Sequence, residues 1–170
     1  MLSLPNPKIL SLRHQELSMK SASTVLLGLA LLGTAGLAHA AGNCTVTLKG
    51  DDAMKFDLKT ATVSAACPTV TIELVHAGKL PVTVMGHNVV ISKTSDMAGI
   101  ASAAVKAGAA NQYVPKGDAR VIAHSGLVGG GEKTKLTVPG KKLTAGGDYT
   151  FFCSFPGHST MMKGKLVVTP

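Results

Sequence analysis

Short runs of alternating apolar and polar residues, or of β-branched residues, recur along residues 41–170. Such runs are typical of β-strands. Turn signals such as Ala77-Gly78, Pro139-Gly140 and Gly146-Gly147 separate them, and short strands joined by turns indicate a sandwich or barrel. We therefore predict an all-β domain, a Greek-key β-sandwich or barrel. The predicted strands cover residues 44–48, 69–75, 82–84, 134–138, 149–153 and 164–168.

One stretch, residues 96–110, departs from the strand pattern because it is rich in Ala and Met. Its apolar residues recur at helical spacing from Met97 to Val105, and Ser95 or Asp96 is available as an N-cap. We predict one short external helix here, packed outside the sandwich.

Residues 1–40 differ in composition from the rest of the chain. Lys20 precedes an apolar, small-residue stretch that ends in Ala38-His39-Ala40, which fits a secretory signal with an Ala-x-Ala cleavage site. We predict a signal peptide over residues 1–40, cleaved after Ala40, with Met19 as an alternative start. Its apolar core, residues 25–37, is shorter than the roughly 20 residues of a membrane span, so we expect no stable membrane insertion of the mature chain. An uncleaved anchor is the alternative interpretation.

The run CSFPGHSTMM, residues 153–162, carries the most specific chemistry in the chain. Cys153, His158 and Met162 follow a Cys-x4-His-x3-Met spacing, and Pro156-Gly157 forces a turn that lets them converge. A thiolate, an imidazole and a thioether together suit copper. Met161 offers a second thioether, and the residues alone do not decide between the two.

A second imidazole has to come from elsewhere in the chain. His87 lies between Gly86 and Asn88, about 66 residues before Cys153. His76 and His124 compete for this role, but neither lies beside a Gly-Asn pair. A His2Cys set with a weak axial Met is the geometry of blue-copper electron-transfer sites.

The chain has three cysteines, so one is left over once a disulfide forms. Exported domains retain disulfides, and we predict a bridge between Cys44 and Cys67 that stabilises the fold by roughly 3 kcal/mol. An unpaired thiol in an oxidising compartment is a liability unless it is buried or bound to metal, which fits Cys153. A bridge from Cys153 to either other cysteine is the alternative, and it would leave the His158 and Met162 spacing without a purpose.

In these motifs the chain resembles the azurins, type 1 blue copper proteins of the cupredoxin family. The resemblance runs from about Gly42 to Thr169, and the lengths of the gaps between Cys153, His158 and Met162 favour azurins over other cupredoxins. It implies a cupredoxin-like fold, one bound copper ion and a helical insertion at the predicted helix. The matching segments are Met85-Gly86-His87-Asn88, Val121-Ile122-Ala123-His124, Gly131-Glu132-Lys133 and residues 151–158.

The resemblance also implies the roles of individual residues. Copper would be bound by His87, Cys153, His158 and the axial Met162, with the backbone carbonyl of Gly86 as a weak contact. Hydrogen bonds from Asn88, Ser154 and the backbone near Phe155 would tune the ligands. His76 and His124 resemble azurin histidines that do not bind the functional copper. An apolar patch around the His158 imidazole edge, where electrons enter and leave, would comprise Met54, Leu80, Met85, Phe155, Pro156 and Met161.

Together these features predict a periplasmic copper protein that passes single electrons between redox partners such as c-type cytochromes or a periplasmic reductase. A filled ligand set leaves no open position for a substrate, so we predict that it is not an enzyme. The rivals are an enzyme with a Cys153 nucleophile and a His158 base, and a copper-storage or copper-delivery module.

The charge of the chain is consistent with a protein partner. Residues 41–170 carry 14 Lys and Arg against 8 Asp and Glu, a net charge of +6. Nucleic-acid binding would require lysines interleaved with stacking aromatics, but the chain has only four Phe, two Tyr and no Trp. We therefore predict no nucleic-acid partner, and we expect the charge to favour an acidic redox partner.

Overall fold

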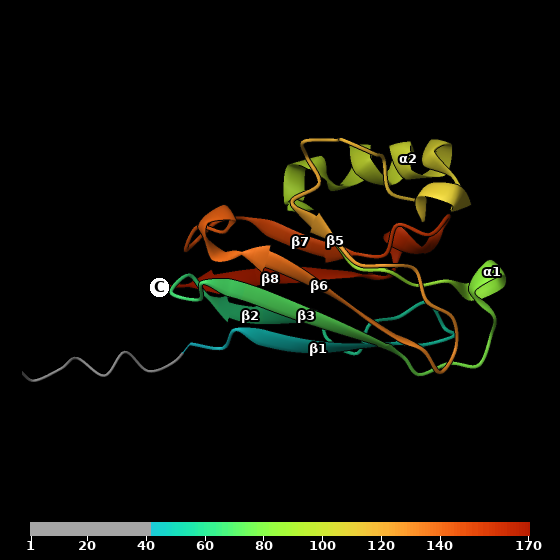
Figure 1. The fold of residues 1–170 in the computed structure, drawn as a ribbon, viewed down its shortest axis with the longest axis horizontal. Coiled ribbons are helices and arrows are strands. Elements are labelled where there is room, and N and C mark those ends of the chain that lie inside the picture. Colours follow the sequence, from blue (N-terminus) through green and yellow to red (C-terminus); the bar gives the residue numbers. More distant parts are fainter. Residues whose placement is uncertain (1–41) are drawn as a thin grey trace, which may run out of the picture. The chain divides into compact units, whose positions relative to one another are not determined.

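Two β-sheets form the framework of the protein in the computed structural model, which describes residues 42–170 (Figure 1). The first sheet has three strands, in the order β1 (Thr45–Gly50), β3 (Thr69–His76) and β6 (Lys133–Pro139). The second has five strands, in the order β2 (Thr60–Ser64), β8 (Lys163–Thr169), β7 (Tyr149–Phe152), β4 (Val90–Lys93) and β5 (Ala123–His124).

The sheets combine parallel and antiparallel pairs. β1 is parallel to β3 and β2 is parallel to β8, whereas the β3–β6, β7–β8, β4–β7 and β4–β5 pairs are antiparallel. In β1 every second residue is buried, as expected for a strand with one face on the core. The main core includes Leu48, Ile72, Phe151 and Leu166, all fully buried. The predicted β-sandwich is confirmed.

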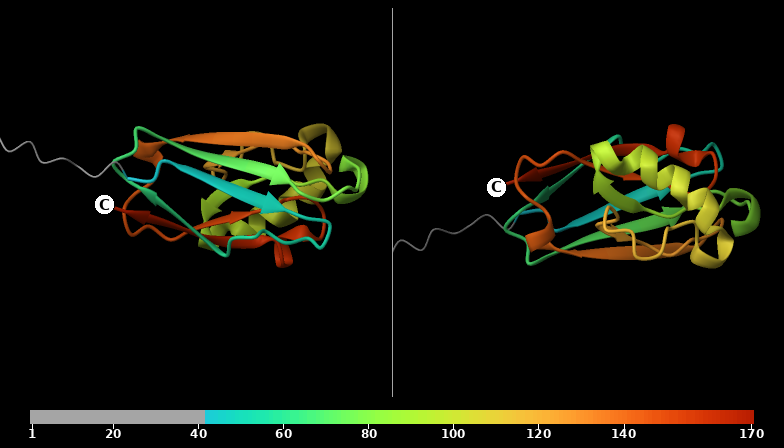
Figure 2. Two further views of the ribbon diagram at one scale, coloured as in Figure 1. Left: turned by 90° about the horizontal axis from the view of Figure 1, so that it is seen from below. Right: turned by 90° about the horizontal axis from the view of Figure 1, so that it is seen from above.

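The predicted external helix is also present, as α2 (Met97–Ala107), flanked by the 3-10 turns η1 (Thr94–Asp96) and η2 (Ala109–Asn111). Asp96 occupies the N-cap position without a side-chain capping hydrogen bond. The helix lies over the five-stranded sheet (Figure 2). Beneath it is a second, smaller core that groups Ile100 with Val90 and Phe152 of that sheet. Gly108 ends it with a φ of 68°, a conformation that favours glycine.

The strand predicted at residues 82–84 is wrong. This segment is one helical turn, α1 (Val82–Met85), because the Pro81 carbonyl accepts the amides of Val84 and Met85 at 2.9 Å each. No residue of α1 is buried, and the segment belongs to neither sheet. The strand predicted at residues 149–153 ends one residue earlier, since Cys153 lies just beyond β7. The short strands β2, β4 and β5 are not among the predicted strands.

A disulfide links Cys44 and Cys67, and Cys153 is free and buried, which confirms the predicted pairing. The bridge joins the residue before β1 to the loop between β2 and β3. The predicted signal peptide, residues 1–40, and its alternative start at Met19 lie outside the described residues. Within residues 42–170, no helix has the length and hydropathy that crossing a membrane would require.

One end of the sandwich gathers segments that are distant in sequence. β1 and β3 end there, α1 lies beyond them, and the loop from β7 to β8 passes nearby through η4 (His158–Thr160) (Figure 1). The C-terminus lies at the other end, as does the turn η3 (Gly140–Lys142), whose Gly140 amide bonds the Pro68 carbonyl beside the disulfide.

Candidate metal centre

The sequence-predicted donors His87, Cys153 and His158 come together at this end of the sandwich. Their ligand atoms all lie within 4.8 Å of one another, and all three side chains are buried. Reciprocal backbone hydrogen bonds with Val128, both 2.9 Å, fix the position of His87 after α1. Cys153 directly follows β7, and His158 begins η4. His158 is only 3% exposed, so the solvent-facing imidazole edge expected from the sequence is a small window.

The predicted turn at Pro156-Gly157 brings His158 back toward Cys153. The His158 amide donates to the Phe155 carbonyl at 3.0 Å, and Gly157 adopts φ 83° and ψ −19°, as in the third position of a type II turn. Cys153 Sγ lies 3.7 Å from His158 Nδ1. The Cys153 amide bonds the Met162 carbonyl at 3.0 Å, so the loop closes where β7 and β8 meet.

Met162 and Gly86 lie beside this cluster. Met162 is fully buried, whereas Met161 is 51% exposed. A Cβ on Gly50 would lie 2.7 Å from Met162 Cε and 2.9 Å from His87 Cδ2, so only glycine allows both side chains to approach β1 this closely. The Gly86 carbonyl lies 3.8 Å from Cys153 Sγ and 3.0 Å from His87 Nδ1. The Gly86 carbonyl therefore adjoins two of the three donors, and the Met162 side chain lies beside His87.

Hydrogen bonding orients the His87 ring. Its Nε2 lies 2.8 Å from the Asp51 carbonyl, and donation there leaves the Nδ1 lone pair for a metal. The His76 ring stacks on His87 with centroids 4.2 Å apart and planes within 12° of parallel. His76 accepts the Gly78 amide on Nδ1 and donates Nε2–H to the Met85 carbonyl. It therefore supports His87 without joining the cluster.

Asn88 links the two ligand-bearing segments. Its Oδ1 accepts the Ser154 amide at 2.9 Å, and its Nδ2 donates to Ser154 Oγ at 2.8 Å and to the Gln112 carbonyl at 3.1 Å. Both side chains are buried. Because Asn88 follows His87 and Ser154 follows Cys153, these bonds fix the separation of two donors.

Burial determines the charge state of the donors. It raises the pKa of the Cys153 thiol to about 11, although the backbone amides of Asn88 and Phe155 hydrogen-bond to it and act in the opposite direction. Burial, followed by the charges of His87 and His76, lowers the pKa of His158 to about 4. Burial also lowers the pKa of His87. Near neutral pH the metal-free site thus holds a thiol and two neutral imidazoles, and with a thioether beside them this donor set fits a single copper ion.

The sequence of residues 42–169 matches the profile of copper-binding proteins of the plastocyanin/azurin family. The chain belongs to this family. An azurin from Bordetella pertussis is 49% identical over 142 residues, covering 84% of this chain and 95% of the relative. An azurin from Pseudomonas chlororaphis is 50% identical over 125 residues, covering 74% and 98%. Among solved structures, the azurin Az-iso2 of Methylomonas sp. strain J matches with a TM-score of 0.72 and 39% identity, covering 75% of this chain and 98% of that one.

Membership of the azurin family agrees with the predicted fold and with copper as the cofactor. It identifies the chain as a copper electron-transfer protein and not as an enzyme, as the sequence predicts.

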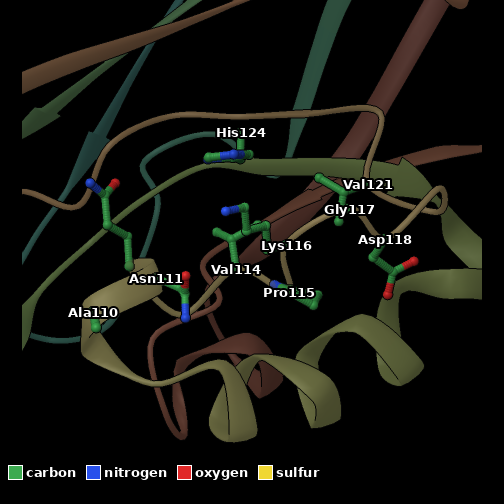
Figure 3. A pocket seen from close by; sticks show the side chains of 10 residues that line it. Ala110, Asn111, Val114, Pro115, Lys116, Gly117, Asp118, Val121 and His124 are labelled. Carbon is green, nitrogen blue, oxygen red and sulfur yellow. The ribbon is translucent and has the colours of Figure 1, made fainter.

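His124, the other histidine considered from the sequence, lies away from the metal centre of this azurin-family chain. It lines a hollow of about 450 Å³ together with Lys116 and Val121 of the loop between α2 and β5 (Figure 3). Its Nδ1 lies 3.1 Å from the Ser125 carbonyl. His124 does not belong to the donor cluster.

The predicted patch residues differ in exposure. Met161 and Leu80 are exposed, at 51% and 38%, whereas Met54, Met85, Phe155 and Pro156 are partly buried. The Phe155 ring lies 4.6 Å from His158 and also packs against the main core. Val84 of α1 is 57% exposed beside Met85. It is not among the predicted patch residues, because a strand is predicted over this segment.

Several contributors to the site carry no sequence signal. Asp51 and Gln112 act through backbone carbonyls, which any residue would supply. Gln112 adopts φ 55°, a left-handed conformation that the sequence does not indicate. The stacking of His76 on His87 also depends on how the sheets bring the two segments together. Of these contributors, only Gly50 can be noticed in the sequence, because a glycine at the end of a predicted strand suggests a close approach of other groups to the backbone.

Proposed function

We propose that this chain is a periplasmic type 1 blue copper protein that passes single electrons between redox partners. The observation that supports this most directly is the cluster itself, in which the ligand atoms of His87, Cys153 and His158 already lie within 4.8 Å of one another in a buried site. When bound, copper supplies a one-electron Cu(I)/Cu(II) couple. The chain's own residues supply a shielded ligand set of fixed shape.

In this proposal Met162 would supply the weak fourth side-chain donor, and the Gly86 carbonyl would make a further weak contact. The burial of Met162 against Gly50 and His87 supports this choice over Met161, which faces solvent. Asn88 and Ser154 hold the two ligand segments together, and the amides of Asn88 and Phe155 hydrogen-bond to the Cys153 sulfur. Such bonds withdraw charge from a ligating sulfur and stabilise the reduced site.

Electrons would enter and leave through the apolar patch of Met54, Leu80, Met85, Phe155, Pro156 and Met161. The contact of Phe155 with His158 and the exposure of Met161 support this path. Small apolar interfaces suit brief encounters between redox proteins. The expected partners are c-type cytochromes or a periplasmic reductase.

Export is the remaining part of the proposal. Signal cleavage after Ala40 would leave a domain of residues 41–170 in the periplasm, where its disulfide is stable. Peptide mass mapping of the N-terminus of protein purified from the periplasmic fraction tests this point, and an N-terminus other than Ala41 would contradict the cleavage site.

The state of Cys153 argues against the rival nucleophilic enzyme. A catalytic cysteine needs an accessible thiolate, but this thiol is fully buried and its pKa is raised to about 11.

Replacing the thiolate tests the proposed function. The mature domain loaded with Cu(II) should absorb intensely near about 600 nm, because thiolate-to-copper charge transfer is the origin of the blue colour. Cys153→Ser should fold, retain at most weak Cu(II) binding and show no blue band. His124→Ala is the matched control, since His124 lies away from the donors, and it should stay blue. A blue Cys153→Ser variant would remove Cys153 from the site.

A further inference from the structure

Three lysines, Lys59, Lys163 and Lys165, lie where the start of β8 adjoins the loop before β2, and Lys59 contacts Met161. Lys59 Nζ donates to the Met161 carbonyl at 3.3 Å, and the Lys59 carbonyl accepts the Lys165 amide at 2.9 Å. Lys163 follows Met162 at the start of β8 and lies two residues from Lys165, so both point to the same face of the sheet. β2 and β8 are parallel neighbours in the five-stranded sheet.

These three lysines are exposed, and none of them forms an ion pair with another described residue. Among residues 42–170 the one ion pair is between Arg120 and Asp118. A single carboxylate, Asp148, lines the hollow that contains Lys163 and Lys165, and its Oδ1 accepts the Thr94 hydroxyl at 3.0 Å. The cluster therefore carries a net positive charge that the described residues do not neutralise.

The cluster lies at the edge of the apolar surface proposed for electron transfer. Met161 is 51% exposed, its amide donates to the His158 carbonyl at 3.1 Å, and Leu58 beside Lys59 is 37% exposed. Apolar contact area and uncompensated positive charge thus adjoin within a few residues of a copper donor.

The opposite side of the same apolar surface has a different charge. Near Leu80, the Asp52 carboxylate accepts the amides of Lys79 and Leu80 at 2.8 and 3.3 Å. The charges of Asp52 and the exposed Lys79 offset each other near Leu80, whereas the rim is positive near Met161, and this asymmetry would favour one orientation of an approaching partner.

We propose that Lys59, Lys163 and Lys165 form a docking site for the acidic surface of a redox protein, which places that protein's Asp and Glu side chains over the β2–β8 edge while its redox centre faces Met161 and His158. This inference rests on the proposed electron-transfer function. It assigns a partner chemistry and an orientation that the apolar patch alone does not specify.

Two triple variants with equal charge change test the proposal. One is Lys59→Gln/Lys163→Gln/Lys165→Gln. Its matched control is Lys135→Gln/Lys141→Gln/Lys142→Gln, which removes exposed lysines from β6 and from η3 near the disulfide end. The probe is an oxidised, acidic c-type cytochrome mixed with reduced, copper-loaded protein in a stopped-flow instrument, at low and high ionic strength.

At low ionic strength, where the Debye length is about 30 Å, the docking-site variant should react about tenfold more slowly than the parent, and the control variant less than about twofold more slowly. Near the Debye length of about 8 Å at physiological salt, the difference should shrink. Electron self-exchange should become faster in the docking-site variant, because two copies no longer repel at this edge. A general disturbance of the metal centre would slow both reactions.

Equal slowing by both triple variants would overturn the proposal, because net charge alone would then explain the effect. An unchanged rate in the docking-site variant would also overturn it. In both cases a blue parent protein that reduces the cytochrome leaves the proposed function intact. A parent that is not blue and exchanges no electrons would reject the proposed function as well.

Discussion

Neighbouring residues bury each of the three donor side chains, and this burial determines their protonation states in the metal-free site. Cys153 is fully buried and its thiol has a raised pKa, whereas His87 and His158 have lowered values. A metal therefore competes with a proton at the sulfur but not at the imidazoles.

The first prediction concerns this competition. Cu(II) binding to the metal-free protein at pH 7 should release about one proton, since the thiol must ionise and the imidazoles are already neutral. The count should rise as the pH falls through the His158 pKa of about 4, where that ring also has to lose a proton. Isothermal titration calorimetry in buffers of different ionisation enthalpy measures it.

Release of two or more protons at pH 7 would contradict the lowered histidine pKa values. Cys153→Ser provides the control, because it removes the ionising thiol and should reduce the release to about zero.

The axial thioether is the second prediction at the residue scale. Met162→Leu should remain blue and shift the reduction potential upward, because losing a weak axial donor favours Cu(I). Met161→Leu should leave the potential nearly unchanged, since Met161 is half exposed and its neighbour occupies the buried position. Cyclic voltammetry compares the pair, and a shift in the Met161 variant alone would reverse the axial assignment.

At the scale of elements, the disulfide and the metal centre lie at different ends of β1. Replacing both Cys44 and Cys67 with Ala should lower the free energy of unfolding by about 3 kcal/mol, because the unfolded chain is released from a loop that spans 23 positions. The visible spectrum of the copper-loaded variant should not change. Urea unfolding followed by far-UV circular dichroism gives the stability, and a loss of the blue band would show that β1 transmits the change to the ligands.

The elements also show what the sequence could predict. Runs of alternating or β-branched residues predicted β1, β3, β6 and β8, in which buried and more exposed residues alternate. Apolar residues at helical spacing predicted α2. Val82–Met85 has the composition of a strand but forms a helical turn, in which the Pro81 carbonyl accepts the amides of Val84 and Met85. β5 has only two residues, too few for any periodicity.

The metal centre was predictable to the extent that its chemistry resides in side chains. Cys153, His158 and Met162 share one loop, and His87 is marked by its neighbours Gly86 and Asn88. The carbonyls of Asp51 and Gln112 and the stack of His76 on His87 were not predictable, because these contacts form only when distant segments pack.

At the scale of the whole molecule, the apolar end of the sandwich should control how fast electrons exchange. Met85→Lys or Met161→Glu should slow electron self-exchange at least about tenfold, because a desolvated charge opposes the dry contact between two copies. The blue spectrum should persist, since neither side chain belongs to the donor cluster. NMR line broadening in mixed-redox samples measures the rate.

Lys141→Glu, at the opposite end of the molecule, is the control for that experiment. It should alter self-exchange far less than the patch variants. A larger effect from Lys141→Glu than from Met161→Glu would move the electron port away from His158.

β1 also separates the Cys44–Cys67 disulfide from the free thiol of Cys153. Cys44 precedes the strand, and Gly50 ends it against Met162 and His87, so about 20 Å of extended chain lies between the bridge and the metal centre. Thiol–disulfide exchange requires a thiolate to reach a bridge sulfur, and the Cys153 sulfur is neither ionised near neutral pH nor within reach. Disulfide rearrangement is thus confined to the unfolded chain, and in the folded sandwich the free thiol of Cys153 stays available for copper without exchanging with the bridge.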